Sequence, residues 1–104
     1  MTAVYTIVAK ANLQELYDEI GINLCGGKSG FGRNKDALYD VLTGGFGKLY
    51  YDKQNKTTTK LIVKQSNLLT PEIRKIFEEA IIESSNYYDP HFLYSYKWLS
   101  IIFA

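Results

Sequence analysis

The stretch from Phe31 to Gly44 constrains the fold most, because it predicts a loop, one short helix and a stop. Asn34 is a residue type that caps helix N-termini, and Gly44 lies where a left-handed helix terminus would fall. At about 100° per residue, one side of this helix is apolar. That side consists of Ala37, Leu38, Val41 and Leu42, and the opposite side carries Asp36, Asp40 and Thr43. The helix therefore needs a core on one side and presents two carboxylates on the other.

The two carboxylates at positions i and i+4 repel each other by a few tenths of a kcal/mol. For Asp36, the positive N-terminus of the helix offsets part of this repulsion energy. Asp40 is too far along the helix to be stabilised in this way. From the spacing alone, a solvated helix face explains both acids. The rest of the chain must supply any functional interpretation.

The size and composition predict one small folded domain, spanning residues 1–104. The net charge of +1 gives no general argument for binding nucleic acid or an anionic membrane. Cys25 is the one cysteine, which excludes an intramolecular disulfide and a multi-cysteine metal site. Neither a signal-peptide pattern nor an apolar run of about 18 residues is present. We therefore expect a cytoplasmic protein.

The N-terminal part of the chain predicts a strand followed by a helix. Ala3 to Ala9 is apolar almost throughout, which favours a strand covered on both faces. Asn12 and Glu15 have the spacing of a capping box, and Gly21 is the expected end of this first helix.

A glycine-rich connection leads from the first helix to the second. Its Gly-Gly-Lys-Ser segment, at 26–29, resembles part of a phosphate-binding loop. That loop requires a glycine where Ile22 stands, with a strand before it and a helix directly after it, and here a helix precedes. A surface loop that positions the second helix is the better interpretation.

The second half of the chain predicts more strands and one helix. Lys48–Asp52 and Thr57–Gln65 could be two strands joined by a turn, which would form a hairpin. Thr70-Pro71-Glu72 predicts a helix start, and we expect that helix to end near Asn86. Its apolar stripe is Ile73, Ile76, Phe77 and Ala80, with Glu72, Glu79 and Glu83 beside it.

Residues 86–92 look like a turn, and the run from Leu93 to Phe103 ends in an apolar strand. Strands separated by helices predict an α/β fold with a mainly parallel sheet.

Catalytic chemistry has little support in the residue pattern. His91 is the one histidine, and a Cys25–His91 pair lacks an obvious orienting acid. One histidine and one cysteine far apart do not make a metal site, so we expect no metal and no cofactor. We expect no enzymatic activity, and a small enzyme that uses His91 is the third alternative. The aromatic residues between Tyr87 and Trp98 could stack on bases, but only Lys97 adds positive charge among them, so packing is the better explanation.

The stretch from Phe31 to Gly44 closely resembles the signature of the barstar family of ribonuclease inhibitors. In that family an aromatic-Gly-x-Asn segment leads into x-Asp-Ala-Leu-aromatic-Asp-x-Leu-Thr-Gly. The matching positions are Phe31, Gly32, Asn34, Asp36, Ala37, Leu38, Tyr39, Asp40, Leu42, Thr43 and Gly44. A thinner match places Glu79 at an acidic position of the family's last helix, where Glu78 and Glu83 are neighbouring alternatives.

The resemblance implies a barstar-like fold, with a small three-stranded sheet packed against helices and room for an extra hairpin strand. It also implies an immunity protein of a toxin–antitoxin pair, which occludes the active site of a bacterial ribonuclease toxin with carboxylates that replace RNA phosphates. The implied partner-binding residues are Phe31, Asn34, Asp36, Tyr39, Asp40, Thr43 and Glu79. The alternative is a barstar-fold interaction module with a non-nuclease partner.

Three departures from the family pattern concern partner choice. A family member is acidic, whereas this chain has a net charge of +1, so long-range steering should be weaker. Gly30 and Gly45 stand where that member has contact aromatics. The segment from Gly45 to Thr59 is longer than expected, and it could be an edge strand, a second contact or a solvated hairpin.

Overall fold

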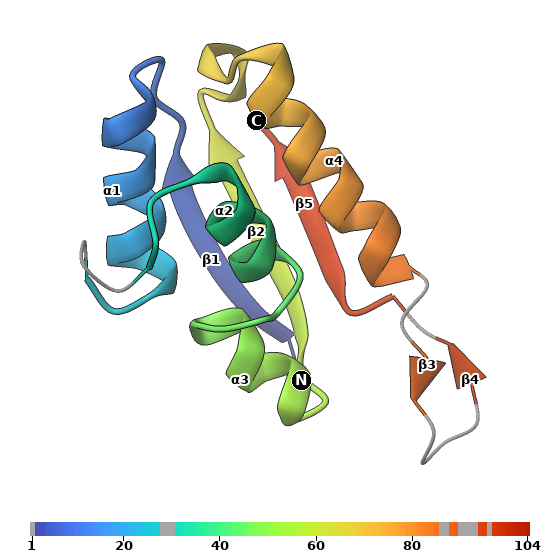
Figure 1. The fold of residues 1–104 in the computed structure, drawn as a ribbon. Coiled ribbons are helices and arrows are strands. Elements are labelled where there is room, and N and C mark those ends of the chain that lie inside the picture. Colours follow the sequence, from blue (N-terminus) through green and yellow to red (C-terminus); the bar gives the residue numbers. More distant parts are fainter. Residues whose placement is uncertain (1, 28–30, 86–87, 90–93, 96) are drawn as a thin grey trace.

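The protein is an α/β domain built on a three-stranded parallel sheet (Figure 1). The computed structural model describes residues 2–27, 31–85, 88–89, 94–95 and 97–104. The strands are β1 (Thr2–Val8), β2 (Thr58–Lys64) and β5 (Leu99–Phe103), in the order β1-β2-β5. The predicted α/β class and parallel sheet are confirmed.

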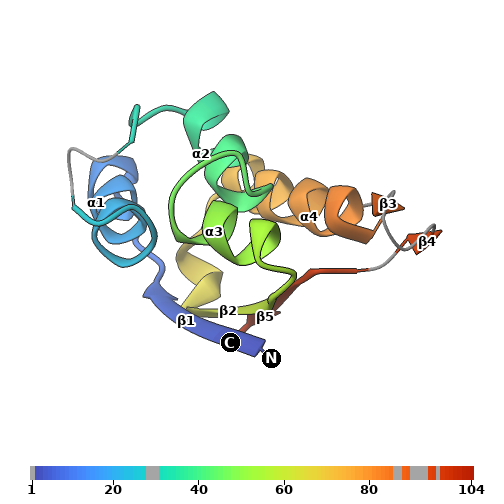
Figure 2. The same cartoon turned by 90° about the horizontal axis from the view of Figure 1, so that it is seen from below.

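In the described part of the chain, four helices cover one face of this sheet (Figure 2). They are α1 (Leu13–Leu24), α2 (Lys35–Leu42), α3 (Lys48–Gln54) and α4 (Pro71–Ser85), and a short 3₁₀ turn, η2 (Ser66–Leu68), precedes α4. The hydrophobic core lies between this helical layer and the inner side chains of the strands, such as Ile7, Leu61 and Leu99.

The outer face of the sheet is open, so the prediction of a first strand covered on both faces is wrong. Val4 on β1 is 57% exposed and Ile102 on β5 is 43% exposed. Their neighbours Ile7 and Leu99, on the inner face, are fully buried. Valine, isoleucine and threonine suit a half-exposed strand as well as a buried one, so the apolar run alone could not reveal this.

The first helix begins as predicted but ends later. The Asn12 side chain accepts a hydrogen bond from the Glu15 amide at 3.0 Å, which confirms the predicted cap. Gly21 does not end the helix, which continues to Leu24. Ile20 and Leu24 are both fully buried, and their burial outweighs the penalty of about 1 kcal/mol for a glycine inside a helix.

The predicted hairpin after the second helix is wrong, because residues 48–54 form α3. Strand β2 is central and pairs in parallel with β1 on one side and β5 on the other. It therefore has no free edge that a preceding strand could join. α3 instead packs on the sheet through the fully buried Leu49.

The last helix and strand are close to prediction. The Thr70 hydroxyl accepts a hydrogen bond from the Ile73 amide at 3.3 Å, which confirms the capped start of α4. Two short antiparallel strands, β3 (Tyr88–Asp89) and β4 (Tyr94–Ser95), follow α4. The expected helix end at Asn86 lies outside the described residues. No helix in the described part of the chain is long and apolar enough to cross a membrane.

Candidate functional site

Helix α2 is fixed at both ends by local interactions that its sequence predicts. The Asn34 side chain accepts a hydrogen bond from the Ala37 amide at 2.8 Å, and Gly44 adopts a φ of +79° directly after the C-cap residue Thr43. Leu38 and Leu42 are fully buried on the side that faces the core. Asp36 and Asp40 are consequently exposed on the opposite side.

Phe31 and Arg33, which precede α2, contact residues of α1. The Arg33 guanidinium contacts the Asp18 carboxylate at 2.6 Å and donates to the Gln14 carbonyl oxygen at 3.2 Å. Phe31 is only 7% exposed, and its ring meets Tyr17 edge-on at 5.7 Å between centroids. Phe31 was predicted as a partner-binding residue, but the structure places it in the core, where it anchors the start of α2.

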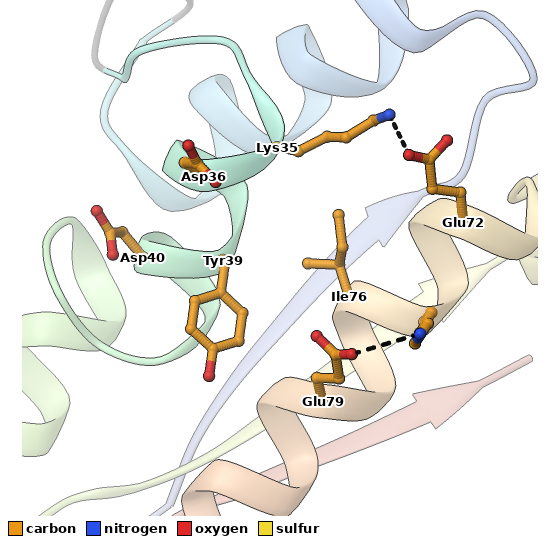
Figure 3. Close-up of a pocket in the computed structure, with 8 residues that line it drawn as sticks. Lys35, Asp36, Tyr39, Asp40, Glu72, Ile76 and Glu79 are labelled. Atoms are coloured by element: carbon orange, nitrogen blue, oxygen red, sulfur yellow. Dashed lines mark hydrogen bonds and ion pairs between the residues drawn. The ribbon is translucent and has the colours of Figure 1, made fainter.

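A groove of about 580 Å³ runs between α2 and α4 (Figure 3). It is lined by Lys35, Asp36, Tyr39, Asp40, Glu72, Lys75, Ile76 and Glu79. Four of the seven predicted partner-binding residues therefore lie together, namely Asp36, Tyr39, Asp40 and Glu79. The other three, Phe31, Asn34 and Thr43, do not line the groove, and the Thr43 hydroxyl is engaged with the Tyr39 carbonyl oxygen at 2.8 Å.

The carboxylates of the groove fall into two groups. Glu72 forms an ion pair with Lys35 across the groove, and Glu79 forms one with Lys75 at 4.0 Å. The side chains of Asp36 and Asp40 have no hydrogen bond or ion pair within the described part of the chain. The two aspartates are thus the groove acids that are available to an external cation.

Tyr39 lies among these acids and extends from α2 towards α4 (Figure 3). Burial raises the pKa of the Tyr39 hydroxyl, and the negative charges of Glu83, Glu79 and Asp40 raise it further. The hydroxyl therefore stays protonated at neutral pH and can donate a hydrogen bond. Together with Ile76, the ring also gives the groove an apolar surface.

The C-terminal end of α2 is held by Lys53 of α3. The Lys53 ammonium donates to the Thr43 carbonyl oxygen at 3.3 Å and lies 5.5 Å from the centroid of the Trp98 ring. Burial lowers the pKa of Lys53, and the nearby Glu83 carboxylate acts in the opposite direction. A cation at this end is favourable, because the last carbonyls of a helix carry partial negative charge. Residues 45–59, the segment that is longer than the family pattern implies, therefore brace the helix that carries the aspartates through Lys53.

Sequence reasoning missed the basic residues of this site. Lys75 could have been found, because it stands four residues before Glu79 on one helix, the usual spacing of an ion pair. Lys35 and Lys53 could not, because their contacts depend on how α2, α3 and α4 pack together.

The remaining candidate groups do not converge on this groove. Burial raises the pKa of the Cys25 thiol, which disfavours the reactive thiolate. The Cys25–His91 pair, which the sequence did not favour, lies partly outside the described residues, because His91 is not among them. Within the residues that the structure describes, no group of three or more His, Cys, Asp or Glu side chains could hold a metal ion.

Comparison of the chain with protein-family models, with curated proteins and with solved structures finds no match.

Proposed function

We propose that this protein is a barstar-like inhibitor that binds a bacterial ribonuclease toxin and occludes its active site. The observation that carries the proposal is the pair of unpartnered carboxylates, Asp36 and Asp40, on the rigid helix α2 at the rim of the groove. The resemblance of residues 31–44 to the barstar signature supports it, and so does the position of Glu79 on the opposite wall of the groove.

The inhibitory mechanism is charge mimicry. A ribonuclease holds RNA phosphates with Arg, Lys and His side chains, and carboxylates at the same spacing can take the place of the phosphates. Charge-assisted hydrogen bonds to a guanidinium are stronger than neutral ones and can be bidentate. Because α2 is capped by Asn34 and braced by Lys53, little conformational entropy is lost when its acids bind.

The partner is a cognate nuclease toxin, and an immunity role places both proteins in the cytoplasm of the producing cell. Since the chain carries a net charge of only +1, the local acids of the groove supply the electrostatic attraction. The inhibitor contributes no catalytic group and needs no cofactor for this role.

The test is an RNA-cleavage assay with a panel of small bacterial ribonucleases, barnase among them, titrated with the wild-type chain. For each enzyme that is inhibited, the inhibition constants of Asp36→Asn and Asp40→Asn are then measured. The matched control is Glu78→Gln, which makes the same change in net charge on α4 but does not line the groove.

We expect each aspartate substitution to weaken inhibition by about 2–5 kcal/mol, the range for one partner of a buried charge pair. Glu78→Gln should change it by less than twofold. If both aspartate variants inhibit within twofold of the wild type, the site is wrongly assigned. If no ribonuclease is inhibited, the chain is better explained as an interaction module with a non-nuclease partner.

A further inference from the structure

The groove between α2 and α4 contains its own cations, and these are not needed to attract a positively charged partner. Four carboxylates and two ammonium groups leave the lining with a net charge of −2. Lys75 is one of the two lysines, and its side chain is 75% exposed at the edge of α4. A cationic partner must approach this ammonium as well as the acids.

Lys75 also occupies one of the acids that such a partner would use. Its ammonium lies 4.0 Å from the Glu79 carboxylate, one turn along the same helix. The carboxylate is 51% exposed, so the pair is a loose surface ion pair that a stronger ligand can displace. The other groove pair, Lys35–Glu72, joins α2 to α4 and therefore also has a part in packing.

We infer that Lys75 acts as a negative determinant of affinity, which competes with the cationic partner for Glu79. This inference rests on the proposed function, since it assumes a partner with positive charge at the groove. In the absence of the partner, Asp36 and Asp40 are the available acids and Glu79 is engaged. When the partner binds, its guanidinium replaces the Lys75 ammonium on Glu79, so the free energy of the Lys75–Glu79 pair is lost on binding. Removing Lys75 should therefore strengthen binding, although it removes an ion pair from the protein.

The experiment measures binding of a blocked tetra-arginine peptide, which presents guanidinium groups without requiring an identified nuclease. Dissociation constants are determined by NMR titration at low ionic strength for the wild type, Lys75→Met and Lys75→Arg. Lys64→Met is the matched control, because it makes the same change in net charge on an exposed residue of β2 that does not line the groove. The double variant Lys75→Met/Glu79→Gln tests whether Glu79 transmits the effect.

We expect Lys75→Met to bind the peptide about three- to tenfold more tightly, as one nearby unit charge at a solvated site would cause. Lys75→Arg should stay within twofold of the wild type, and Lys64→Met within twofold as well. The gain should be largely lost in the double variant when it is compared with Glu79→Gln alone.

Three outcomes would overturn the inference: no gain in Lys75→Met, an equal gain in Lys64→Met, or a gain that persists in full without Glu79. These outcomes are separate from failure of the proposed function, which is judged by nuclease inhibition and by the two aspartate variants. For any ribonuclease that the chain does inhibit, Lys75→Met should lower the inhibition constant in the same direction.

Discussion

Replacing Tyr5 by Phe and Asp52 by Asn, singly and together, tests how α3 is held on the sheet. The Tyr5 hydroxyl of β1 donates to the Asp52 carboxylate at 2.8 Å, and the Thr59 hydroxyl of β2 donates to the same oxygen at 3.2 Å. Asp52 is half-buried, so water replaces these bonds only in part. This network is a polar link between α3 and the two strands beneath it.

The size of the effect follows from the charge of the acceptor. A hydrogen bond to a charged group contributes about 1.5–3 kcal/mol, and partial burial places this one near the lower end. We expect Tyr5→Phe to lower the free energy of unfolding by about 1.5 kcal/mol, and Asp52→Asn by about 1 kcal/mol, because the amide oxygen still accepts. For a chain of this size, the first change would lower the urea midpoint by about 1 M.

The assay is urea unfolding followed by circular dichroism, analysed as a double-mutant cycle. The coupling between the two sites should be about 0.5–1.5 kcal/mol, as for directly contacting groups. Tyr51→Phe is the matched control, since Tyr51 lies on the same helix but is 66% exposed, and its loss of a hydroxyl should change stability by less than about 0.5 kcal/mol. If the two substitutions are additive within about 0.3 kcal/mol, Tyr5 and Asp52 are not in contact and α3 is held in another way.

Three further predictions concern pH, the cap of α2 and two glycines. Burial raises the pKa of Tyr5 to about 12, and the hydrogen bond to Asp52 and the Asp52 charge act in the same direction. The hydroxyl of Tyr5 should therefore contribute fully to stability below pH 10, and this contribution should be lost as the pH rises towards 12. In urea titrations, the stability difference between wild type and Tyr5→Phe should shrink over that range. Asn34→Ala should lower the free energy of unfolding by about 1 kcal/mol, because the cap of α2 is lost. Asn34→Asp should keep most of the wild-type stability, because aspartate also caps helices. Equal melting temperatures for the two variants would exclude the capping role. Gly26 and Gly47 both have positive φ, but an added Cβ meets nothing within 4 Å at Gly26 and lies 2.6 Å from the Leu24 carbonyl oxygen at Gly47. Gly47→Ala should therefore destabilise the protein clearly more than the roughly 1 kcal/mol expected for Gly26→Ala, and the reverse order in thermal unfolding would contradict this local geometry.

The sequence predicted those elements whose signals are local. Helix α2 was predictable because Asn34, Gly44 and the buried leucines all specify the same segment. The start of α4 was predictable from Thr70 and Pro71 for the same reason. The open face of the sheet was not predictable, because it depends on all the described helices packing on one side. The identity of α3 was not predictable either, because it depends on which strands lie on either side of β2. Tyr50 and Tyr51 favour a strand by propensity, yet the following strand β2 is already paired on both sides and cannot form a hairpin with them.

The candidate site was predictable to a similar extent. The spacing of Asp36 and Asp40 placed both acids on one exposed helix face, and the family resemblance added Glu79 from a distant part of the chain. The groove brings these three side chains together. The resemblance implied that Phe31 contacts a partner, but its ring is buried against Tyr17. A contact of that kind depends on tertiary packing, which residue spacing does not reveal.

Competition between this chain and a nucleotide for one ribonuclease shows whether the chain binds in the active site. If the carboxylates of the α2–α4 groove replace RNA phosphates, the chain and a mononucleotide inhibitor cannot occupy the active site of an inhibited ribonuclease together. We expect that nucleotide at ten times its own dissociation constant raises the apparent dissociation constant of the chain about tenfold, by mass action. An apparent dissociation constant that does not change with nucleotide would show that binding occurs elsewhere on the enzyme and would contradict active-site occlusion.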